Sequence, residues 1–428
     1  MELVICFIWG IILPLLIAAF STYIFRKNAW IIILIEIPMI LFFTLTDIVT
    51  RYPTGNIKYQ LVSYFMNITN NFYLRYLPFV IFTTIFIVYF KEKINIKDLN
   101  MENNIMKESD FSKYYFLGRW TKKYIDDTEC MYTINLGSEI HTKIKGTKSI
   151  RIKFLNTNPI GNSVEIAYKI NDEDYIRDNV SNSQFILENL DENKEYVLKI
   201  VVAGNKDEDN VWSGNQGIAF TGIDVDKDGV VEPVTTNKKI GLFYGDSITA
   251  GCWVLDRNLP SQGYASEANY VAKCCEALGC LNVRVAFSAV GVTKGGTGGA
   301  PKFIDFIDNM DSTTEERSQL PDFIVINMGI NDHEATMKEF QSELLKCVKR
   351  IQEKYNGITI LLMLPFSNAR KEEIKKVVAT TENTVFIDTT DWKIECIDKK
   401  HPNLEGSKVV GRKIAEELLN YYGEEYFK

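Results

Sequence analysis

Apolar and polar positions follow three different patterns along the 428 residues of the chain. The first pattern is continuous: residues 3–25 carry no charged side chain, and about 20 apolar residues suffice to span a bilayer. Residues 29–46 and 76–90 are further candidate spans, although a glutamate interrupts the former and the latter has only 15 uncharged positions. We therefore expect residues 1–92 to form a transmembrane anchor region of two to three helices, followed by a polar linker over residues 93–111.

The second pattern is an alternation of apolar and polar positions between residues 112 and 236. Ile150, Ile152 and Phe154 alternate with charged residues, and similar alternation recurs in residues 164–170 and 196–200. A period of two places every second side chain on one buried face of a strand, and Asn, Gly, Asp and Pro residues between the runs favour turns. This region is therefore predicted to be an antiparallel β-sandwich of jelly-roll type, without a helix of ten or more residues.

The third pattern, an alternation of short apolar runs with helical periodicity, fills residues 237–428. We expect strands at residues 239–244, 283–287, 322–327, 358–364 and 385–387, and helices at residues 264–278, 337–355, 371–378 and 407–422. Strands that alternate with helices form right-handed crossovers, which produce a parallel sheet covered on both faces. The predicted class of this region is α/β.

One serine stands at the exit of the first predicted strand of that sheet. Ser247 follows Gly245 on a turn that feeds a helix, where free backbone N–H groups favour developing negative charge. Near the C-terminus, Asp398 precedes His401 by three residues on a loop before the last predicted helix. A serine, a histidine and a carboxylate are the minimum set for acyl transfer through a serine ester.

The chain has only three histidines, which narrows the choice of base. His141 lies in a segment with no other chemical signal, so a surface or packing role is expected. His333 directly follows Asn331 and Asp332, and it either lines the cleft or caps a helix. His401 is therefore the predicted base.

Acyl transfer also needs donors where the carbonyl oxygen becomes an oxyanion. Gly291 and Asn331 follow the second and third predicted strands, and the ends of parallel strands meet at one edge of a sheet. The N–H groups of Ser247 and Gly291 and the side-chain amide of Asn331 are the candidate donors.

Four short blocks, in chain order, resemble those of the SGNH (GDSL) hydrolase superfamily. The blocks are Gly245-Asp246-Ser247, Gly291, Gly329-x-Asn331-Asp332 and Asp398-x-x-His401. This resemblance covers roughly residues 238–428 and implies a three-layer, flavodoxin-like sheet domain. It also implies that Ser247 is the nucleophile, that His401 is the general base oriented by Asp398, and that Gly291 and Asn331 complete the oxyanion hole.

The order of the two regions carries a second resemblance. A β-sandwich at residues 112–236 followed by an SGNH domain at residues 237–428 is similar to carbohydrate esterase family two and to related cell-envelope acyl esterases. Residues 116–120 (Phe-Leu-Gly-Arg-Trp) are similar to the Gly-Arg segment that opens the sandwich in that family.

The charge of the chain excludes nucleic acid as a partner, and the spacing of its cysteines and acidic residues argues against metal sites. A net charge of −7 and a pI near 5.4 provide no basic surface for nucleic acid. Six of the eight cysteines lie in the hydrolase region without metal-ligand spacing, which indicates reduced structural thiols. Residues 224–229 imitate the start of an EF-hand, but Thr235 stands at the twelfth position, so an Asp-Gly hairpin turn is expected there. No metal or cofactor is expected.

The sequence thus predicts an integral membrane protein of the cell membrane, in contact with the lipid bilayer, that carries a serine esterase removing O-acetyl groups from a carbohydrate. An O-acetyltransferase that acylates a cell-envelope or exported polysaccharide is one alternative, and a glycan-binding protein with a vestigial active site is another. The side of the membrane on which the catalytic region lies stays open, because it depends on the number of spans. The sugar, the acyl chain and the oligomeric state are not readable from the sequence.

Overall fold

The computed structural model describes residues 110–157, 163–180 and 184–428. All of them belong to one compact unit, Glu108–Lys428. The predicted membrane spans at residues 3–25, 29–46 and 76–90 lie outside the described residues. In the part of the chain that the structure describes, no helix combines the length and the apolar character that crossing a bilayer requires.

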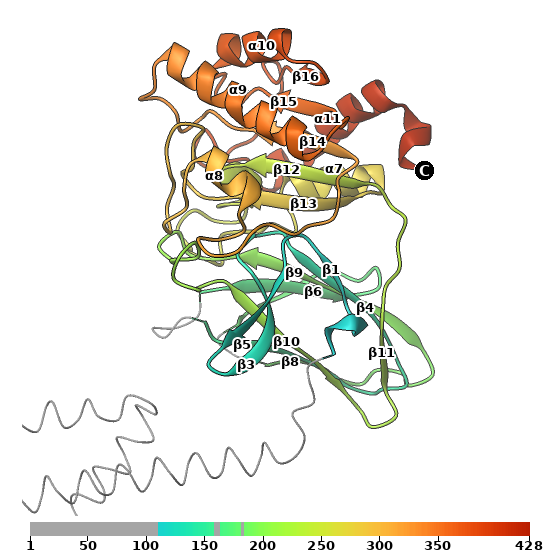
Figure 1. Cartoon of the computed structure of the whole chain (residues 1–428). Helices are drawn as coiled ribbons and strands as arrows, with labels where there is room; N and C mark the ends of the chain where they lie inside the picture. The colour runs from blue at the N-terminus through green and yellow to red at the C-terminus, as the bar shows by residue number, and fades with distance from the viewer. Residues whose placement is uncertain (1–109, 158–162, 181–183) are drawn as a thin grey trace, which may run out of the picture. The chain divides into compact units, whose positions relative to one another are not determined.

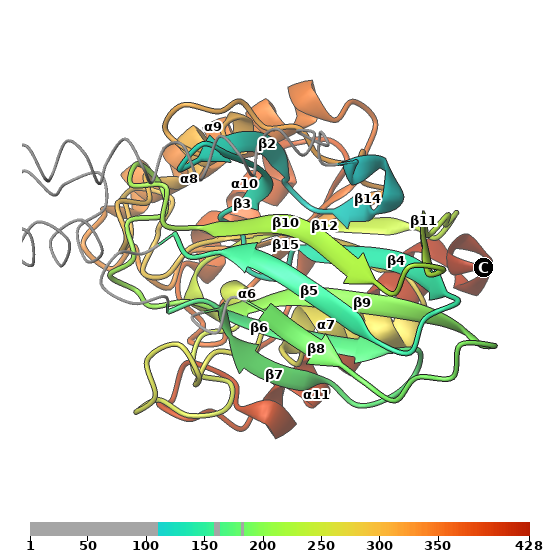
Figure 2. The same cartoon turned by 90° about the horizontal axis from the view of Figure 1, so that it is seen from below.

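Two antiparallel β-sheets follow a short 3-10 helix, η3 (Phe111–Lys113), and face each other (Figures 1 and 2). One sheet has the strand order β1-β4-β9-β6-β7, with β11 paired to β4, and the other has the order β2-β3-β10-β5-β8. The strands are β1 (Tyr115–Leu117), β2 (Thr121–Ile125), β3 (Thr128–Thr133), β4 (Glu139–Lys145), β5 (Ile150–Leu155), β6 (Glu165–Ile170), β7 (Ile176–Asn179), β8 (Gln184–Leu187), β9 (Glu195–Gly204), β10 (Ile218–Val225) and β11 (Val230–Pro233).

The alternation seen in the sequence buries one face of each sheet against the other. Ile140 and Ile144 of β4 and Ile152 and Phe154 of β5 belong to one shared core with Phe220 of β10. From β3 to β10 the chain passes back and forth between the two sheets, and only β6 and β7 are consecutive strands of the same sheet. This connectivity is that of a jelly roll.

The Asp-Gly segment after β10 forms a turn, but the hairpin expected there is wrong. The Gly229 N–H donates to the Asp226 carbonyl at 2.8 Å, so the chain does reverse at this point. However, β10 belongs to one sheet while β11 pairs with β4 of the other. The turn therefore crosses the edge of the sandwich, because a turn signal does not specify which sheet the next strand joins.

Five parallel strands form a third sheet with the order β13-β12-β14-β15-β16, which is the flavodoxin-like order. The strands are β12 (Ile240–Gly245), β13 (Leu281–Ala286), β14 (Phe323–Asn327), β15 (Ile360–Met363) and β16 (Thr384–Ile387). The helices are α6 (Ser247–Ala250), α7 (Tyr270–Leu278), α8 (Phe303–Asp308), α9 (Met337–Lys354), α10 (Lys371–Thr380), α11 (Leu404–Tyr422) and the 3-10 helix η5 (Glu424–Phe427).

The helices cover both faces of this sheet and make three layers (Figure 1). Helices α7 and α11 share a core with one face of the strands, which includes Phe243 and Val325. Helices α8, α9 and α10 share a core with the other face, which includes Leu242 and Ile324. The predicted α/β class and the parallel sheet are confirmed.

Three helices depart from the expected pattern. α6 and α8 span four and six residues, too short to show an amphipathic period. α7 begins at Tyr270, later than expected, because the Asn269 side chain caps its first turn by accepting from the N–H groups of Val271 and Ala272.

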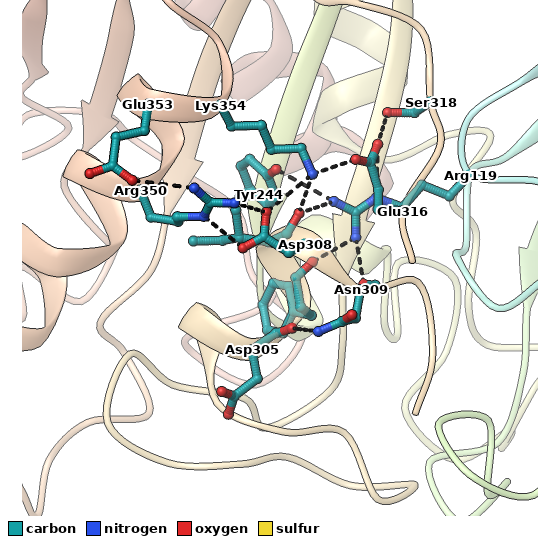
Figure 3. A network of polar contacts seen from close by, with 12 residues as sticks. Arg119, Tyr244, Asp305, Asp308, Asn309, Glu316, Ser318, Arg350, Glu353 and Lys354 are labelled. Atoms are coloured by element: carbon teal, nitrogen blue, oxygen red, sulfur yellow. Dashed lines mark hydrogen bonds and ion pairs between the residues drawn. The ribbon is translucent and has the colours of Figure 1, made fainter. Parts of the chain in front are cut away.

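One of the residues of the sandwich that contact the parallel-sheet domain is a buried arginine, Arg119, which lies between β1 and β2. Figure 3 shows its polar contacts. Its guanidinium donates to three backbone carbonyls at the end of α8, namely Phe306 at 2.6 Å, Ile307 at 3.0 Å and Asn309 at 3.1 Å. The last carbonyls of a helix have no intrahelical donor, so Arg119 caps α8 from the other domain. The nearby Glu316 carboxylate, 3.7 Å from its Nε, is 4% exposed and also pairs with Lys354.

Candidate active site

Ser247 is the first residue of α6, immediately beyond the carboxyl end of β12. The Asp246 carboxylate caps this one-turn helix by accepting from the Ile248 N–H at 3.0 Å. A Cβ at Gly245 would collide with the Thr249 side chain, so only glycine permits this tight exit from the strand. The nucleophile predicted from the sequence therefore lies at a sharp strand-to-helix turn.

Three side chains form a hydrogen-bonded series at this point. Ser247 Oγ lies 2.8 Å from His401 Nε2, and His401 Nδ1 lies 2.9 Å and 3.0 Å from the two oxygens of Asp398. The Asp398 carboxylate also accepts from the backbone N–H of His401 at 2.8 Å, which fixes the loop that carries the imidazole. The structure thus brings together the three residues that the sequence assigned to acyl transfer; their catalytic roles stay predictions.

The electrostatic surroundings of His401 and Asp398 favour an imidazole that is neutral near pH 7. Burial lowers the pKa of His401, while the hydrogen bond and charge of Asp398 and the weaker field of Asp207 oppose this lowering. Burial alone would raise the pKa of Asp398, but the hydrogen bonds from His401 outweigh it, and the pKa of Asp398 is lowered. A neutral imidazole beside an ionised carboxylate can accept the hydroxyl proton of Ser247.

The three expected oxyanion donors differ in their availability. Ser247 is the first residue of α6, so its N–H has no intrahelical acceptor. The Asn331 side chain donates one N–H to the Val290 carbonyl at 2.9 Å, which leaves the second N–H of the amide. The Gly291 N–H donates to the Lys294 carbonyl at 3.0 Å in this structure, and its role as an oxyanion donor stays a prediction.

Asp332 explains why a glycine stands at position 291. Its carboxylate accepts from the N–H groups of Val292 and Thr293, at 3.0 Å and 2.7 Å. A Cβ at Gly291 would lie 2.6 Å from Asp332 Oδ1, so the two chain segments approach this closely only with glycine. The loop after β13 is therefore held by the loop after β14.

Gly329 and Asp246 also belong to the sequence blocks that resemble the SGNH superfamily. Gly329 permits a backbone conformation, and Asp246 caps a helix. Gly329 has a φ of +129°, a conformation that favours glycine. Burial raises the pKa of Asp246 to about 7; the Ile248 N–H opposes the shift and the Asp332 carboxylate adds to it. Asp246 is thus a cap whose ionisation is disfavoured by its surroundings.

Ser247 and Asn331 follow neighbouring strands, β12 and β14, on either side of the point where the strand order reverses. In open parallel sheets, ligands bind in the crevice beyond the carboxyl ends of the strands at this point. The topology of the sheet therefore places the predicted residues where a substrate-binding site is expected.

The two remaining histidines lie apart from this series. His333 is exposed, with its Nε2 3.9 Å from Glu334. His141 lies on β4, where its Nε2 is 2.6 Å from the buried Glu139 carboxylate. Within the described residues, no group of three or more His, Cys, Asp or Glu side chains has the arrangement of a metal site.

Two residues beside the series were missed by the sequence. Trp253 has its ring centroid 4.6 Å from that of His401. Asp207, from the sandwich loop between β9 and β10, accepts a hydrogen bond from the Tyr264 hydroxyl, and its charge opposes the lowering of the pKa of His401. An aromatic residue shortly after the nucleophile was a possible signal for Trp253, whereas no local pattern indicates that a sandwich loop reaches this site.

A serine, a histidine and an aspartate in hydrogen-bonded series at the carboxyl edge of a flavodoxin-like sheet define a serine hydrolase domain of the SGNH class. In agreement, residues 243–409 match the GDSL-like lipase/acylhydrolase family. The chain therefore carries a GDSL/SGNH hydrolase domain. No curated protein matches the chain.

Solved structures share the two-part architecture at low sequence identity. A family two carbohydrate esterase from Clostridium thermocellum, in complex with cellohexaose, is 16% identical with a TM-score of 0.60, over 72% of this chain and 100% of that one. An acetyl xylan esterase from the rumen bacterium Butyrivibrio proteoclasticus is 16% identical with a TM-score of 0.60, over 75% and 98%. A salicylyl-acyltransferase from a tetracycline biosynthetic pathway is 14% identical with a TM-score of 0.54, over 73% and 97%. At these identities the likeness establishes the fold.

Proposed function

We propose that this protein is a membrane-anchored serine esterase that removes O-acetyl or other short acyl groups from a carbohydrate. The observation that supports the reaction class is the contact between Ser247 Oγ and His401 Nε2 at 2.8 Å, with Asp398 on the other ring nitrogen. The substrate class is supported by the similarity of the fold to a carbohydrate esterase in complex with cellohexaose and to an acetyl xylan esterase.

The reaction proceeds through an acyl-enzyme. Ser247 Oγ forms a bond to the ester carbonyl carbon while its proton passes to His401 Nε2. The Ser247 N–H and the free N–H of Asn331 donate to the oxyanion. The bond to the sugar oxygen then breaks, and that oxygen takes the proton from His401. Water repeats the sequence on the acyl-enzyme and releases the acid.

The test is replacement of the nucleophile. We expect Ser247→Ala to abolish release of acetate from acetylated cello- or xylo-oligosaccharides and hydrolysis of p-nitrophenyl acetate, with an unchanged circular dichroism spectrum. Ser312→Ala is the matched control, since Ser312 is exposed on a loop outside the site. Retained turnover in the Ser247 variant would exclude the assigned nucleophile.

An acyltransferase is the second candidate, because the fold is also similar to that of a salicylyl-acyltransferase. The acyl-enzyme and its donors would be the same, and only the attacking hydroxyl would differ, a sugar in place of water. Product analysis with and without an acceptor sugar separates the two: free acetate indicates hydrolysis, and an acetylated acceptor indicates transfer.

The membrane anchor is part of the proposal and is supported by the uncharged stretch at residues 3–25. A membrane-impermeant fluorophosphonate label on intact and permeabilised cells tests the sidedness of Ser247. Labelling of intact cells places the site outside, and labelling only after permeabilisation places it inside. Recovery of the protein in the soluble fraction would contradict the anchor.

A further inference from the structure

A tryptophan in a backbone conformation that tryptophan rarely adopts lies directly against the predicted catalytic base. Trp253 has a φ of +58°, in the left-handed region where a bulky residue is an outlier. Residues held in such conformations cost free energy and cluster at active sites, where the surrounding structure fixes them. The position is therefore one at which packing or function outweighs backbone preference.

The loop that carries Trp253 is tied at both ends. The Cys252 N–H donates to the Ser247 carbonyl at 3.0 Å, and the Leu255 N–H donates to the Gly263 carbonyl at 3.0 Å. Between them Val254 is 3% exposed. These contacts leave the backbone of Trp253 little freedom, so its ring is held in one place relative to α6.

The ring of Trp253 makes two contacts of different kinds. Its centroid lies 4.6 Å from that of the His401 imidazole, with an interplanar angle of 60°. The guanidinium carbon of Arg257, from the same loop, lies 5.3 Å from the centroid of the Trp253 ring. An aromatic ring that is stacked by a cation and meets an imidazole edge-to-face is restrained in its tilt as well as its position.

His401 needs a restraint of this type. Its two ring nitrogens are bonded to Ser247 and Asp398, and these two bonds define an axis through the imidazole. Rotation about that axis would leave the two nitrogens in place but tilt the ring plane, which would turn the Nε2 lone pair away from the serine hydroxyl and the Nδ1 N–H away from Asp398. A third contact from the side of the ring prevents this rotation, and Trp253 provides it. His401 is itself 8% exposed, and this burial lowers its pKa.

We propose that Trp253 is a positioning residue for the catalytic base, and that its strained backbone is retained because it aims the indole ring at the imidazole of His401. This inference rests on the proposed function, since it assigns to Trp253 a role in the same acyl-transfer step. It predicts that kcat/KM depends on the presence of an aromatic ring at position 253. The melting temperature should depend instead on how readily the residue there adopts a left-handed backbone.

Three variants separate these two dependences in the full-length protein. Trp253→Phe keeps an aromatic ring and the left-handed backbone, so kcat/KM for p-nitrophenyl acetate is expected to stay within about threefold of wild type. Trp253→Ala and Trp253→Gly both remove the ring, and kcat/KM is expected to fall about 10- to 100-fold, equally in both. Glycine adopts the left-handed conformation without strain, so the Gly variant is expected to melt about 1–3 °C above the Ala variant.

A matched pair calibrates the stability difference. Asn189 has a φ of +62°, is exposed, and lies after β8 in the sandwich, outside the site. Asn189→Ala and Asn189→Gly should show a similar difference in melting temperature with wild-type kcat/KM. This pair reports the backbone effect of a left-handed position alone.

Three results would overturn the role of Trp253 while leaving the esterase intact. Higher activity in the Gly variant than in the Ala variant, in step with its stability, would make Trp253 a structural residue. Activity within threefold of wild type in both variants, or a loss in the Phe variant as large as in the Ala variant, would remove the ring from the mechanism. A wild-type protein as inactive as Ser247→Ala would reject the proposed function itself, and the positioning role with it.

Discussion

The buried carboxyl of Asp246 predicts an unusual pH dependence of stability, which Asp246→Asn tests. The carboxyl caps α6 with one oxygen, and burial raises its pKa from 3.8 to about 7 in the folded protein. An asparagine keeps an oxygen that can accept from the Ile248 N–H, but it cannot ionise. The variant therefore isolates the cost of holding a carboxyl, beside Asp332, at this position.

The sign follows from proton uptake on folding. Between pH 3.8 and about 7 the unfolded chain has lost the proton of Asp246 while the folded protein keeps it, so the free energy of unfolding falls as pH rises. The slope is about 1.4 kcal/mol per pH unit, and over about three units the loss reaches about 4 kcal/mol. Above pH 7 both states are ionised and the loss stays constant.

Urea unfolding of wild type and Asp246→Asn at pH 4, 5.5 and 8 measures this difference. We expect equal stability near pH 4 and an advantage of the Asn variant that grows to about 4 kcal/mol at pH 8. Subtracting the two curves removes every other titrating group, because only position 246 differs. A difference that does not change with pH, or an Asn variant that is less stable at pH 8, would refute the raised pKa of Asp246.

Three further substitutions test other parts of the structure. Asn331→Ala should lower kcat by about 10²–10³-fold if its free N–H donates to the oxyanion, and steady-state kinetics with an unchanged kcat would exclude this donor. Asp398→Asn should reduce kcat less than His401→Ala if Asp398 only orients the imidazole, and the reverse ranking in the same assay would contradict that role. Arg119→Met removes a buried cation from three carbonyls and from Glu316, so urea unfolding should show a loss of about 3–5 kcal/mol, with Arg119→Lys in between. A stability of Arg119→Met within 0.5 kcal/mol of wild type would contradict its interdomain cap.

The architecture could be predicted from the sequence because its apolar residues recur with the periods of strands and helices. Alternation of apolar positions marked β5, β6 and β9, and each of the five parallel strands coincides with an apolar run. The short helices α6 and α8 were not readable, since four to six residues provide no amphipathic period. The partner of β11 was not readable either, because strand pairing depends on contacts distant in the sequence.

The candidate site shows the same contrast: residues in sequence motifs could be predicted, whereas contacts that depend on how the loops fold could not. Motif spacing correctly indicated that Ser247, Asp398 and His401 would meet, although 154 positions separate the serine from the histidine. The engagement of the Gly291 N–H by the Lys294 carbonyl was not predictable, since it depends on how one loop folds back on itself. The contact of Trp253 with His401 depends on a left-handed backbone, which no residue preference of tryptophan indicates.

The sandwich is more than a neighbour of the hydrolase domain, because it contacts both the loop that follows β13 and helix α8, which follows that loop. The Phe303 N–H of α8 donates to the Gly291 carbonyl at 3.1 Å, and Arg119 caps the same helix. In the loop, Gly298 packs so closely on the Asp209 carbonyl of the sandwich that a Cβ would collide. The Ser247, His401 and Asp398 side chains come from the hydrolase domain alone, whereas the loop beside them depends on the sandwich. Hydrolysis of small esters should therefore depend on the hydrolase domain. The choice of a larger substrate should depend on both the hydrolase domain and the sandwich.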